Sequence, residues 1–294
     1  RRIGDYVYRI GQPAEAMGRV PDVAVVNLSN ACPHIQEVCL AADVLVLHLI
    51  GEHNLLPLVE ERKKRGLRTV YEISDNFLAL PPWVPFRRWF QDPANLGTTF
   101  QLIRMSDGVQ GVSEFLLEQF GFLHDRRLVF ENQVMDLPPL RPKSGSPFVI
   151  GWAGSLGHTH DIARIAPSIV EICQNRKDVR FAFMGNLEQY ERVFGREPQP
   201  AFSYREPGSL EDYYAFLEGL DIGLAPLEDT AYNLCRSDVK FLEYASRGAV
   251  PVLSDLGPYR THVVHGQNGF LFQDPASLSR LLDALLNDPE RVMQ

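Results

Sequence analysis

Short apolar runs alternate with longer amphipathic stretches along almost the whole chain, and this alternation restricts the fold more than any other feature. Parallel strands need a crossover of about a dozen residues, usually a helix, and their buried faces make them rich in Val, Ile and Leu. We predict strands at 23–27, 44–49, 69–73, 108–112 and 128–131, and then at 148–152, 179–184, 202–204, 222–225, 250–254 and 269–272. The sequence therefore predicts an α/β protein with parallel sheets.

A proline-rich stretch separates the two sets of predicted strands. Residues 136–147 hold four prolines and one glycine, which is the composition of an extended linker. The length of 294 residues corresponds to about two domains of roughly 150 residues each. We therefore expect two Rossmann-like, doubly wound domains, 1–142 and 143–294, that face an interdomain cleft. No apolar strand precedes the helix-like opening, so the N-terminal domain is expected to lack its first strand.

Charge and hydropathy exclude several classes of function. The chain has 37 acidic and 29 basic residues, a net charge of −8, and no block of Lys and Arg that would bind nucleic acid. Its apolar runs are far shorter than the 18 or so residues of a membrane span, so we expect no transmembrane segment. The opening residues also lack the apolar core of a signal peptide, which predicts a cytoplasmic protein.

The cysteine pattern predicts neither disulfides nor a metal site. There are four cysteines, with no CxxC pair and no histidine cluster at zinc spacing, namely Cys32, Cys39, Cys173 and Cys235. We interpret them as reduced thiols.

A glycine-containing loop opens the second half of the chain. The apolar run that ends at Ile150 is followed by Gly154, Ser155 and Gly157, and a helical pattern begins near Asp161. A strand, a glycine loop and a helix start together favour an anion, because free backbone N–H groups and the helix dipole point at one place. The spacing does not match the dinucleotide fingerprint, and a tight turn that needs glycine for steric reasons is the alternative interpretation.

A second candidate site lies on a predicted helix that Ser237 or Asp238 caps and that ends at Gly248. Lys240 and Glu243 are three residues apart and share one face of this helix. A carboxylate can accept two hydrogen bonds from a ribose diol, and a lysine can neutralise phosphate. The alternative is an ordinary surface ion pair.

Four segments in order resemble the group 1 glycosyltransferases, the large retaining family with the GT-B fold. They are IGWAGSLGHTHD, DIGLAPLED, KFLEYASRGAVPVLSD and GQNGFLF, and the resemblance covers residues 148–290 well and the first half weakly. The resemblance implies a metal-independent hexosyltransferase of polysaccharide or glycoconjugate biosynthesis that uses no cofactor. Its C-terminal domain would bind a nucleoside diphosphate sugar, and its N-terminal domain would bind the sugar or glycoconjugate acceptor.

The resemblance also implies roles for particular residues. Glu243 matches the second glutamate of the family's E-x7-E motif, which binds the ribose, whereas the first glutamate position holds Cys235, a neutral thiol. Arg236 and Lys240 are expected to stabilise the leaving diphosphate. His158 stands in the loop where many relatives place an Arg or Lys; it either does part of that work in its charged form or caps the helix that begins near Asp161. The other expected donor-binding residues are Gly154, Ser155, Asn233, Ser237, Asp238 and Val239. Beside Arg205, Glu206 is expected to contribute to the choice of base.

The acceptor side is expected in the first half. Tyr8 and Arg9 resemble an opening that lies near the cleft in some relatives, and Asp75 resembles an acidic motif reduced here to one carboxylate. His53, with His48 and Glu52, follows a predicted strand and can meet the acceptor, or serve as a satisfied polar residue. An aromatic and basic loop holds Trp83 and Trp89; it either packs as an ordinary loop or touches a sugar or a lipid headgroup, which leaves room for a peripheral membrane contact.

Three hypotheses about function stay open on the sequence. The first is transfer of a sugar from a nucleoside diphosphate sugar to an acceptor hydroxyl with retention of configuration. The second is a sugar-nucleotide epimerase on the same fold. The third is a non-catalytic module that binds nucleotide sugars, motivated by the thiol of Cys235.

Overall fold

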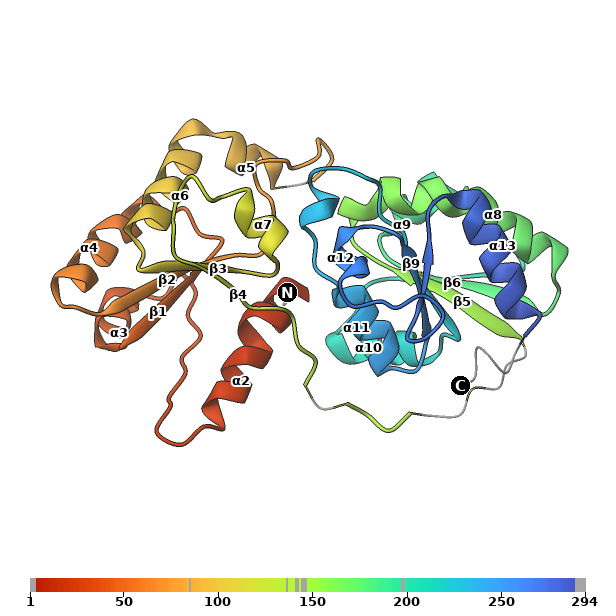
Figure 1. Ribbon diagram of the computed structural model, residues 1–294, viewed down its shortest axis with the longest axis horizontal. Helices are drawn as coiled ribbons and strands as arrows, with labels where there is room; N and C mark the ends of the chain where they lie inside the picture. Colours follow the sequence, from red (N-terminus) through yellow and green to blue (C-terminus); the bar gives the residue numbers. More distant parts are fainter. Residues whose placement is uncertain are drawn as a thin grey trace. The chain divides into compact units, whose positions relative to one another are not determined.

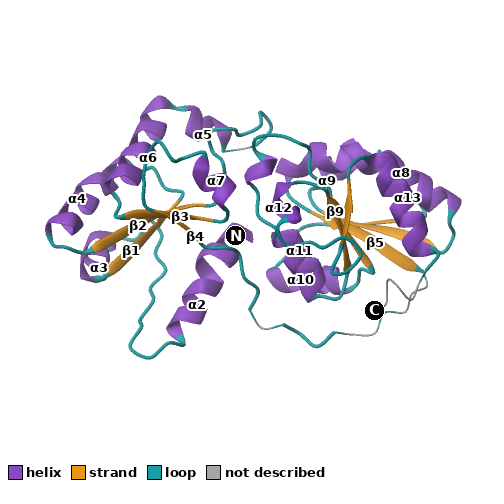
Figure 2. Ribbon diagram, viewed as in Figure 1, coloured by secondary structure: helices purple, strands orange, loops and turns teal. Residues whose placement is uncertain are grey.

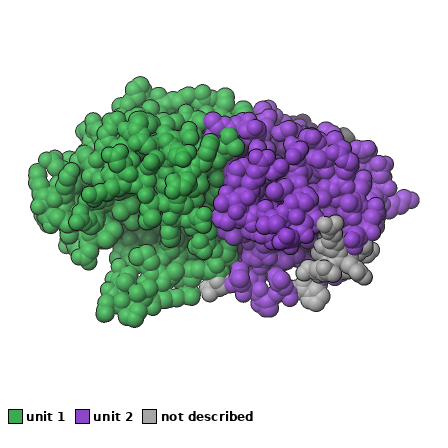
Figure 3. All heavy atoms as spheres, in the orientation of Figure 1, with its two compact units in different colours: residues 1–135, 234–237 green, residues 136–233, 238–294 purple. Residues whose placement is uncertain are grey.

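The computed structural model describes residues 4–84, 86–135, 137–140, 143, 147–196 and 199–288. The chain forms two compact units, which Figure 3 colours separately. Unit 1 comprises residues 1–135 and 234–237, and unit 2 comprises residues 136–233 and 238–294. The division by contacts thus falls at Met135, before the boundary expected near residue 143, and it assigns a short segment of the second half to unit 1.

Unit 1 contains a parallel sheet of four strands in the order β1-β2-β3-β4. The strands are β1 (Val44–His48), β2 (Arg68–Ile73), β3 (Gly108–Gly111) and β4 (Arg127–Val129). These strands confirm the predictions at 44–49, 69–73, 108–112 and 128–131. The central strand β2 is the most buried, with Tyr71 and Ile73 fully covered.

Figures 1 and 2 show the helices of unit 1; most pack around this sheet, and Gln12–Gly18 extends away from it with no buried residue. They are α1 (Gly4–Tyr6), the π-helix η1 (Val7–Gly11), α2 (Gln12–Gly18), α3 (Ile35–Ala41), the 3-10 helix η2 (His53–Leu55), α4 (Leu56–Lys64), α5 (Arg87–Gln91), α6 (Pro93–Met105) and α7 (Glu114–Glu118). Asp92 caps α6 by accepting from the N–H groups of Ala94 and Asn95, and Pro93 occupies its first position.

The strand predicted at 23–27 is wrong, because the structure has extended chain without a strand there. Val23, Val25 and Val26 are all exposed, Val26 at 65%. A run of Val residues becomes a strand only when a neighbouring strand accepts its hydrogen bonds and a layer covers its side chains. In the described part of unit 1, β1 pairs only with β2, so this run has no such partner.

Unit 2 contains a parallel sheet of six strands in the order β10-β9-β8-β5-β6-β7. They are β5 (Phe148–Ala153), β6 (Val179–Met184), β7 (Phe202–Arg205), β8 (Ile222–Ala225), β9 (Val250–Ser254) and β10 (Phe270–Phe272), and each confirms a prediction. Counted from β5, this is the 3-2-1-4-5-6 order of doubly wound sheets. The direction of winding reverses between β5 and β8, and such folds bind ligands beyond the carboxyl ends of the strands at this point.

Helices cover both faces of the second sheet (Figure 1). They are the 3-10 helices η3 (Leu156–His158) and η4 (Asn233–Cys235), and α8 (Thr159–Asn175), α9 (Leu187–Phe194), α10 (Leu210–Glu218), α11 (Val239–Ser246), α12 (Gly257–Arg260) and α13 (Pro275–Leu286). One buried cluster joins α8, α9 and α13 to one face, and a second joins α10, α11 and α12 to the other. The second face needs small residues, because a Cβ atom on Gly223 would lie 2.3 Å from the Tyr244 ring.

Candidate functional site

The reversal between β5 and β8 defines where the candidate site of unit 2 lies. The loop after β5 holds residues 154–158 and leads into α8, and the loop after β8 holds residues 226–233. Both loops leave the carboxyl ends of adjacent parallel strands, so the topology alone brings them to the same edge of the sheet.

Gly154 is required for packing, and its amide is not available to an anion. The Gly154 N–H donates to the carbonyl of Met184 at 3.1 Å, and a Cβ atom on Gly154 would lie 2.4 Å from the Trp152 ring. The steric interpretation of this glycine is therefore the one that the structure favours. Ser155 is exposed, and nothing among the described residues accepts from its N–H. Its carbonyl accepts from Gln189 Nε2 at 3.0 Å, which holds the loop in place.

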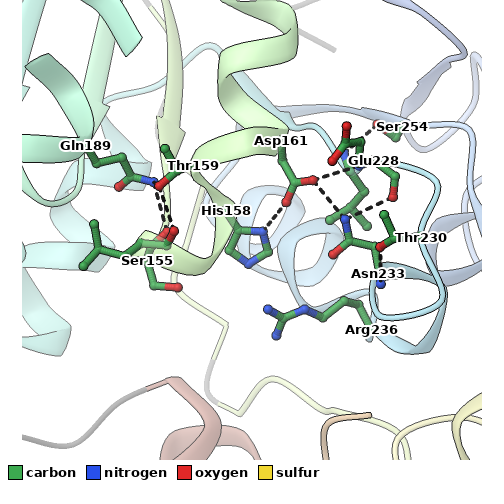
Figure 4. Close-up of polar contacts among 12 residues, drawn as sticks. Ser155, His158, Thr159, Asp161, Gln189, Glu228, Thr230, Asn233, Arg236 and Ser254 are labelled. Carbon is green, nitrogen blue, oxygen red and sulfur yellow. Dashed lines mark hydrogen bonds and ion pairs between the residues drawn. The ribbon is translucent and has the colours of Figure 1, made fainter. Parts of the chain in front are cut away.

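Asp161 joins the loops after β5 and β8 (Figure 4). This carboxylate is 3% exposed. It accepts from the N–H of Glu228 at 2.8 Å and from Asn233 Nδ2 at 2.9 Å, and it lies 2.8 Å from His158 Nδ1. Because a carboxylate only accepts hydrogen bonds, the proton of the contact with His158 resides on Nδ1. A single buried group thus fixes His158 and the loop after β8 relative to each other.

Asn233 has a structural role in this network. Its Nδ2 donates both to Asp161 and to the carbonyl of Glu228, the latter at 3.0 Å, and its backbone N–H donates to Thr230 Oγ1 at 3.1 Å. The side chain is buried. Asn233 would therefore contribute to donor binding only indirectly, by holding the loop after β8 in place.

Glu243 lies in a compact polar cluster with Lys240 and Tyr213. Lys240 Nζ donates to Glu243 Oε2 at 2.9 Å and to the Tyr213 hydroxyl at 2.6 Å, and that hydroxyl donates to Glu243 Oε2 at 2.5 Å. The Lys240 ammonium also lies 4.9 Å from the centre of the Tyr213 ring. Glu243 is nearly buried, whereas the Lys240 side chain remains 23% exposed. Lys240 and Glu243 thus form an ion pair, and the burial of Glu243 distinguishes it from an ordinary surface pair.

Sequence reasoning missed Tyr213. It lies on α10, thirty residues before Glu243, and no local motif connects the two helices. The only signal was a tyrosine in an amphipathic helix, which by itself favours packing.

The segment 234–237 carries three contacts within unit 1. Arg236 Nη1 pairs with Asp75 Oδ1 at 3.1 Å, and Asn132 Nδ2 donates to Ser237 Oγ at 2.8 Å. Asn76 Nδ2 lies 3.3 Å from Cys235 Sγ. Asp75, which the sequence assigned to the acceptor side, thus contacts an expected phosphate-binding residue.

Cys235 is a neutral, covered thiol. It is 1% exposed, and burial raises its pKa to about 11 even though the hydrogen bond from Asn76 lowers it. A thiol in this state cannot act as the carboxylate of the E-x7-E motif described above.

The start of α11 differs from the expected capping arrangement. Asp238 occupies the N-cap position without a side-chain capping bond, and its Oδ2 instead lies 2.8 Å from His262 Nδ1. Val239 begins the helix, and the first helical N–H groups of α11 point beyond its end as in any helix. Glu206, which follows β7, is exposed and stays available for a ligand role.

Arg9 and Tyr8 are buried in unit 1. Arg9 Nη2 pairs with Glu72 Oε1 at 2.6 Å, and Arg9 Nη1 donates to Asn132 Oδ1 and to the carbonyl of Phe130. Burial raises the pKa of Glu72, although Arg9 and Gln110 lower it. Tyr8 is 4% exposed. Neither side chain is presented to a ligand here, because the apolar positions of η1 turn this stretch into the sheet.

His53 lines a small cavity of about 230 Å³ in unit 1. The cavity is formed by Gly51, Glu52, His53, Trp89, Ala94, Asn95 and Thr98. A cavity with one indole and several polar groups has the composition of a site for a polar organic ligand. Trp83 lies at a different cavity, described below.

No helix in the described ranges is long and apolar enough to cross a membrane. No group of three His, Cys, Asp or Glu residues in that part of the chain can hold a metal ion.

Comparison with known proteins finds a matching family for most of unit 2 and solved structures that share the fold of most of the chain. Residues 147–288 match the family model for glycosyl transferases group 1. No curated protein matches the chain.

Three solved structures share the fold at low identity. HepE of Anabaena, solved with UDP-glucose, is 13% identical with a TM-score of 0.61, over 88% of this chain and 73% of HepE. A glycosyltransferase from Rickettsia africae is 15% identical with a TM-score of 0.57, over 92% of this chain and 76% of that protein. TarM of S. aureus, in a complex that includes UDP, is 10% identical with a TM-score of 0.62, over 88% of this chain and 53% of TarM.

Proposed function

We propose that this chain transfers a sugar from a nucleoside diphosphate sugar to an acceptor hydroxyl with retention of configuration. Its residues 147–288 match the group 1 glycosyltransferase family, and the chain has the GT-B fold. Unit 2 would bind the donor, and unit 1 would bind a sugar or glycoconjugate acceptor. The observation that carries the proposal is the cluster of Glu243, Lys240 and Tyr213 on the family-matched unit.

Glu243 would bind the ribose of the donor, and Lys240 would bind a phosphate of the donor. Tyr213 and Lys240 hold the Glu243 carboxylate in one orientation, from which it would accept hydrogen bonds from the two hydroxyls of a ribose. The partly exposed ammonium of Lys240 can turn toward a phosphate, because its flexible stem and compact charge allow it. Neither group needs to be brought in from elsewhere when the donor binds.

The chemical step would break the bond between the anomeric carbon and the diphosphate oxygen. The new bond joins the anomeric carbon to the acceptor oxygen, and the acceptor proton passes to the departing diphosphate. Negative charge grows on the diphosphate as it leaves, so preorganised donors at that position lower the barrier most. We assign this role to Lys240, Arg236, the Ser155 N–H and the N–H groups at the start of α11.

His158 would add to that stabilisation. Asp161 holds its ring in one orientation through Nδ1, and a bound diphosphate would favour the imidazolium. Arg236 pairs with Asp75 and would have to exchange that carboxylate for phosphate. In the proposal no metal ion takes part, so a chelator should leave the rate unchanged.

UDP is the nucleotide to test first, because the solved HepE structure contains UDP-glucose. The experiment is thermal unfolding of the full chain with UDP, GDP and ADP. A nucleotide at 100 times its dissociation constant stabilises the folded protein by about 2.7 kcal/mol. Glu243→Ala should weaken binding of the preferred nucleotide by at least about tenfold, since a hydrogen bond to a charged group contributes about 1.5–3 kcal/mol.

The matched control is Glu171→Ala, an exposed glutamate on α8, which should bind as the wild type does. Equal affinity of Glu243→Ala and the control would refute the ribose assignment. Stabilisation by no nucleotide would refute the donor site itself.

A specific observation favours a second candidate function, a non-catalytic module that binds nucleotide sugars. The buried and neutral Cys235 supplies no carboxylate at the first glutamate position of the family motif. This candidate predicts nucleotide binding with no release of nucleoside diphosphate from any donor, in the presence or absence of acceptor sugars. An isomerised donor would instead indicate an epimerase.

A further inference from the structure

A cavity of about 380 Å³ lies in unit 1 beside α5, outside the site described above. It is lined by Pro82, Trp83, Val84, Arg87, Arg88 and Gln91. Arg87, Arg88 and Gln91 fall on one side of the short helix α5, whereas Trp89 lines the separate cavity that holds His53.

Arg87 and Arg88 both line this cavity and supply its positive charge. Among the residues that the structure describes, no carboxylate lies within ion-pair distance of Arg87 or Arg88. In a chain with a net charge of −8, two adjacent guanidinium groups that line one cavity concentrate positive charge there.

A local contact orients Arg87 without neutralising it. With the Gln91 amide in the orientation that satisfies its hydrogen bonds, Gln91 Oε1 accepts from Arg87 Nε at 2.7 Å and from Arg87 Nη2 at 2.9 Å. Asp92, the nearest acid in sequence, accepts from the N–H groups of Ala94 and Asn95 and so serves the start of α6. The guanidinium of Arg87 is therefore positioned by a neutral group, and its charge remains available.

We propose that this cavity binds a phosphate group carried by an organic molecule. Two guanidinium groups offer several N–H donors in a planar arrangement that matches phosphate oxygens, and they are always charged at physiological pH. The indole of Trp83 and the ring of Pro82 provide an apolar wall for the carbon skeleton next to the phosphate. The carrier is either a sugar phosphate or a phospholipid, since both present the same group.

The experiment measures binding to the full chain, so its outcome does not depend on transferase activity. One arm compares glucose 6-phosphate with glucose by equilibrium dialysis. The other compares vesicles of phosphatidylglycerol with vesicles of phosphatidylcholine by flotation. The test variant is Arg87→Gln/Arg88→Gln, and the charge-matched control is Arg104→Gln/Arg126→Gln, which removes two exposed arginines of the same unit.

We expect the test variant to bind the phosphate probe at least tenfold more weakly in one arm, while the control stays within twofold of the wild type. Loss in the dialysis arm assigns the phosphate to a sugar phosphate, and loss in the flotation arm assigns it to a lipid. Arg87→Lys/Arg88→Lys, which keeps the charge and loses the planar geometry, should fall between wild type and test variant. The proposal is overturned if test and control variants behave alike in both arms, or if neither phosphate probe binds better than its neutral counterpart.

Discussion

Glu72 in unit 1 and Glu243 in unit 2 are two nearly buried carboxylates, each bound by one cation and one neutral side chain. Arg9 and Gln110 bind Glu72, and Lys240 and Tyr213 bind Glu243. The difference lies in the cation, because the Arg9 side chain is 1% exposed and the Lys240 side chain is 23% exposed. When both partners are covered, loss of the cation would leave a buried charge without compensation, whereas a cation that reaches solvent can also receive a ligand.

The largest expected effect is on the covered pair. Arg9→Met leaves Glu72 charged and without its cation, and removal of one partner of a buried pair costs about 3–5 kcal/mol of the free energy of unfolding. Urea unfolding, followed by the fluorescence of Trp83 and Trp89 in a Trp152→Phe background, reports on unit 1 alone. Arg19→Met, which removes an exposed pair with Glu15, should change the same quantity by less than about 1 kcal/mol. Equal effects of the two variants would contradict the contrast.

Lys240→Met should show the opposite pattern. Water can reach the freed Glu243 carboxylate along the path that Lys240 occupies, so we expect the free energy of unfolding to fall by no more than about 1 kcal/mol. Nucleotide affinity should fall at least about tenfold, because a charged hydrogen bond to phosphate is lost. Affinity is measured by titration calorimetry, with Lys177→Met as the control for an exposed lysine. A stability loss as large as that of Arg9→Met, with unchanged affinity, would make Lys240 a structural residue.

A smaller effect is expected for Tyr213→Phe. The variant keeps the ring beneath Lys240 and removes the hydroxyl that donates to Glu243, a loss of about 1 kcal/mol or roughly fivefold in affinity. Tyr214→Phe is the matched control, because Tyr214 is the next residue on α10 and its ring instead meets Arg247. If Tyr213→Phe and Tyr214→Phe bind the nucleotide equally well, Tyr213 does not position Glu243.

The smallest effect concerns the chemical reactivity of the thiols. Cys235 is covered and has a pKa raised by burial to about 11, so it is protonated at neutral pH and should react with iodoacetamide far more slowly than the partly exposed Cys32. Its rate should rise about tenfold per pH unit up to that pKa, because only the thiolate reacts. Mass spectrometry of alkylated peptides gives both rates. Alkylation of Cys235 as fast as Cys32 at pH 7 would show that segment 234–237 leaves unit 1 readily.

The parts of the fold that follow from local pattern were predictable. All six strands of unit 2 lie where their apolar runs indicated, because helices cover both faces of the sheet and bury the apolar residues of its inner strands. The run at 23–27 has the same composition and forms no strand, since strand formation depends on a distant pairing partner that a local pattern does not reveal. An apolar run identifies a strand only when a neighbouring strand pairs with it and other elements cover its side chains.

The candidate site was predictable only where one motif contains it. Glu243 and Lys240 lie on one helix turn and follow from their spacing, and the family resemblance gave them a role. Tyr213 and Asp161 act across 30 and 72 residues of sequence respectively, and such contacts arise only when the sheet brings the elements together. For Arg9 the sequence suggested a place in the site, but the structure buries it. Its partner Glu72, 63 residues away, holds it in the interior.

The position of β5 in the middle of its sheet has a consequence for motion. β5 is paired on one side with β6 and on the other with β8, while β7 and β10 form the edges. Local opening starts at edges and ends, so the amides of β5 should exchange with solvent deuterium among the last in unit 2. The loop that begins at Gly154 is therefore attached to the most persistent part of its unit, and any adjustment to a ligand is confined to the few residues between that strand and α8.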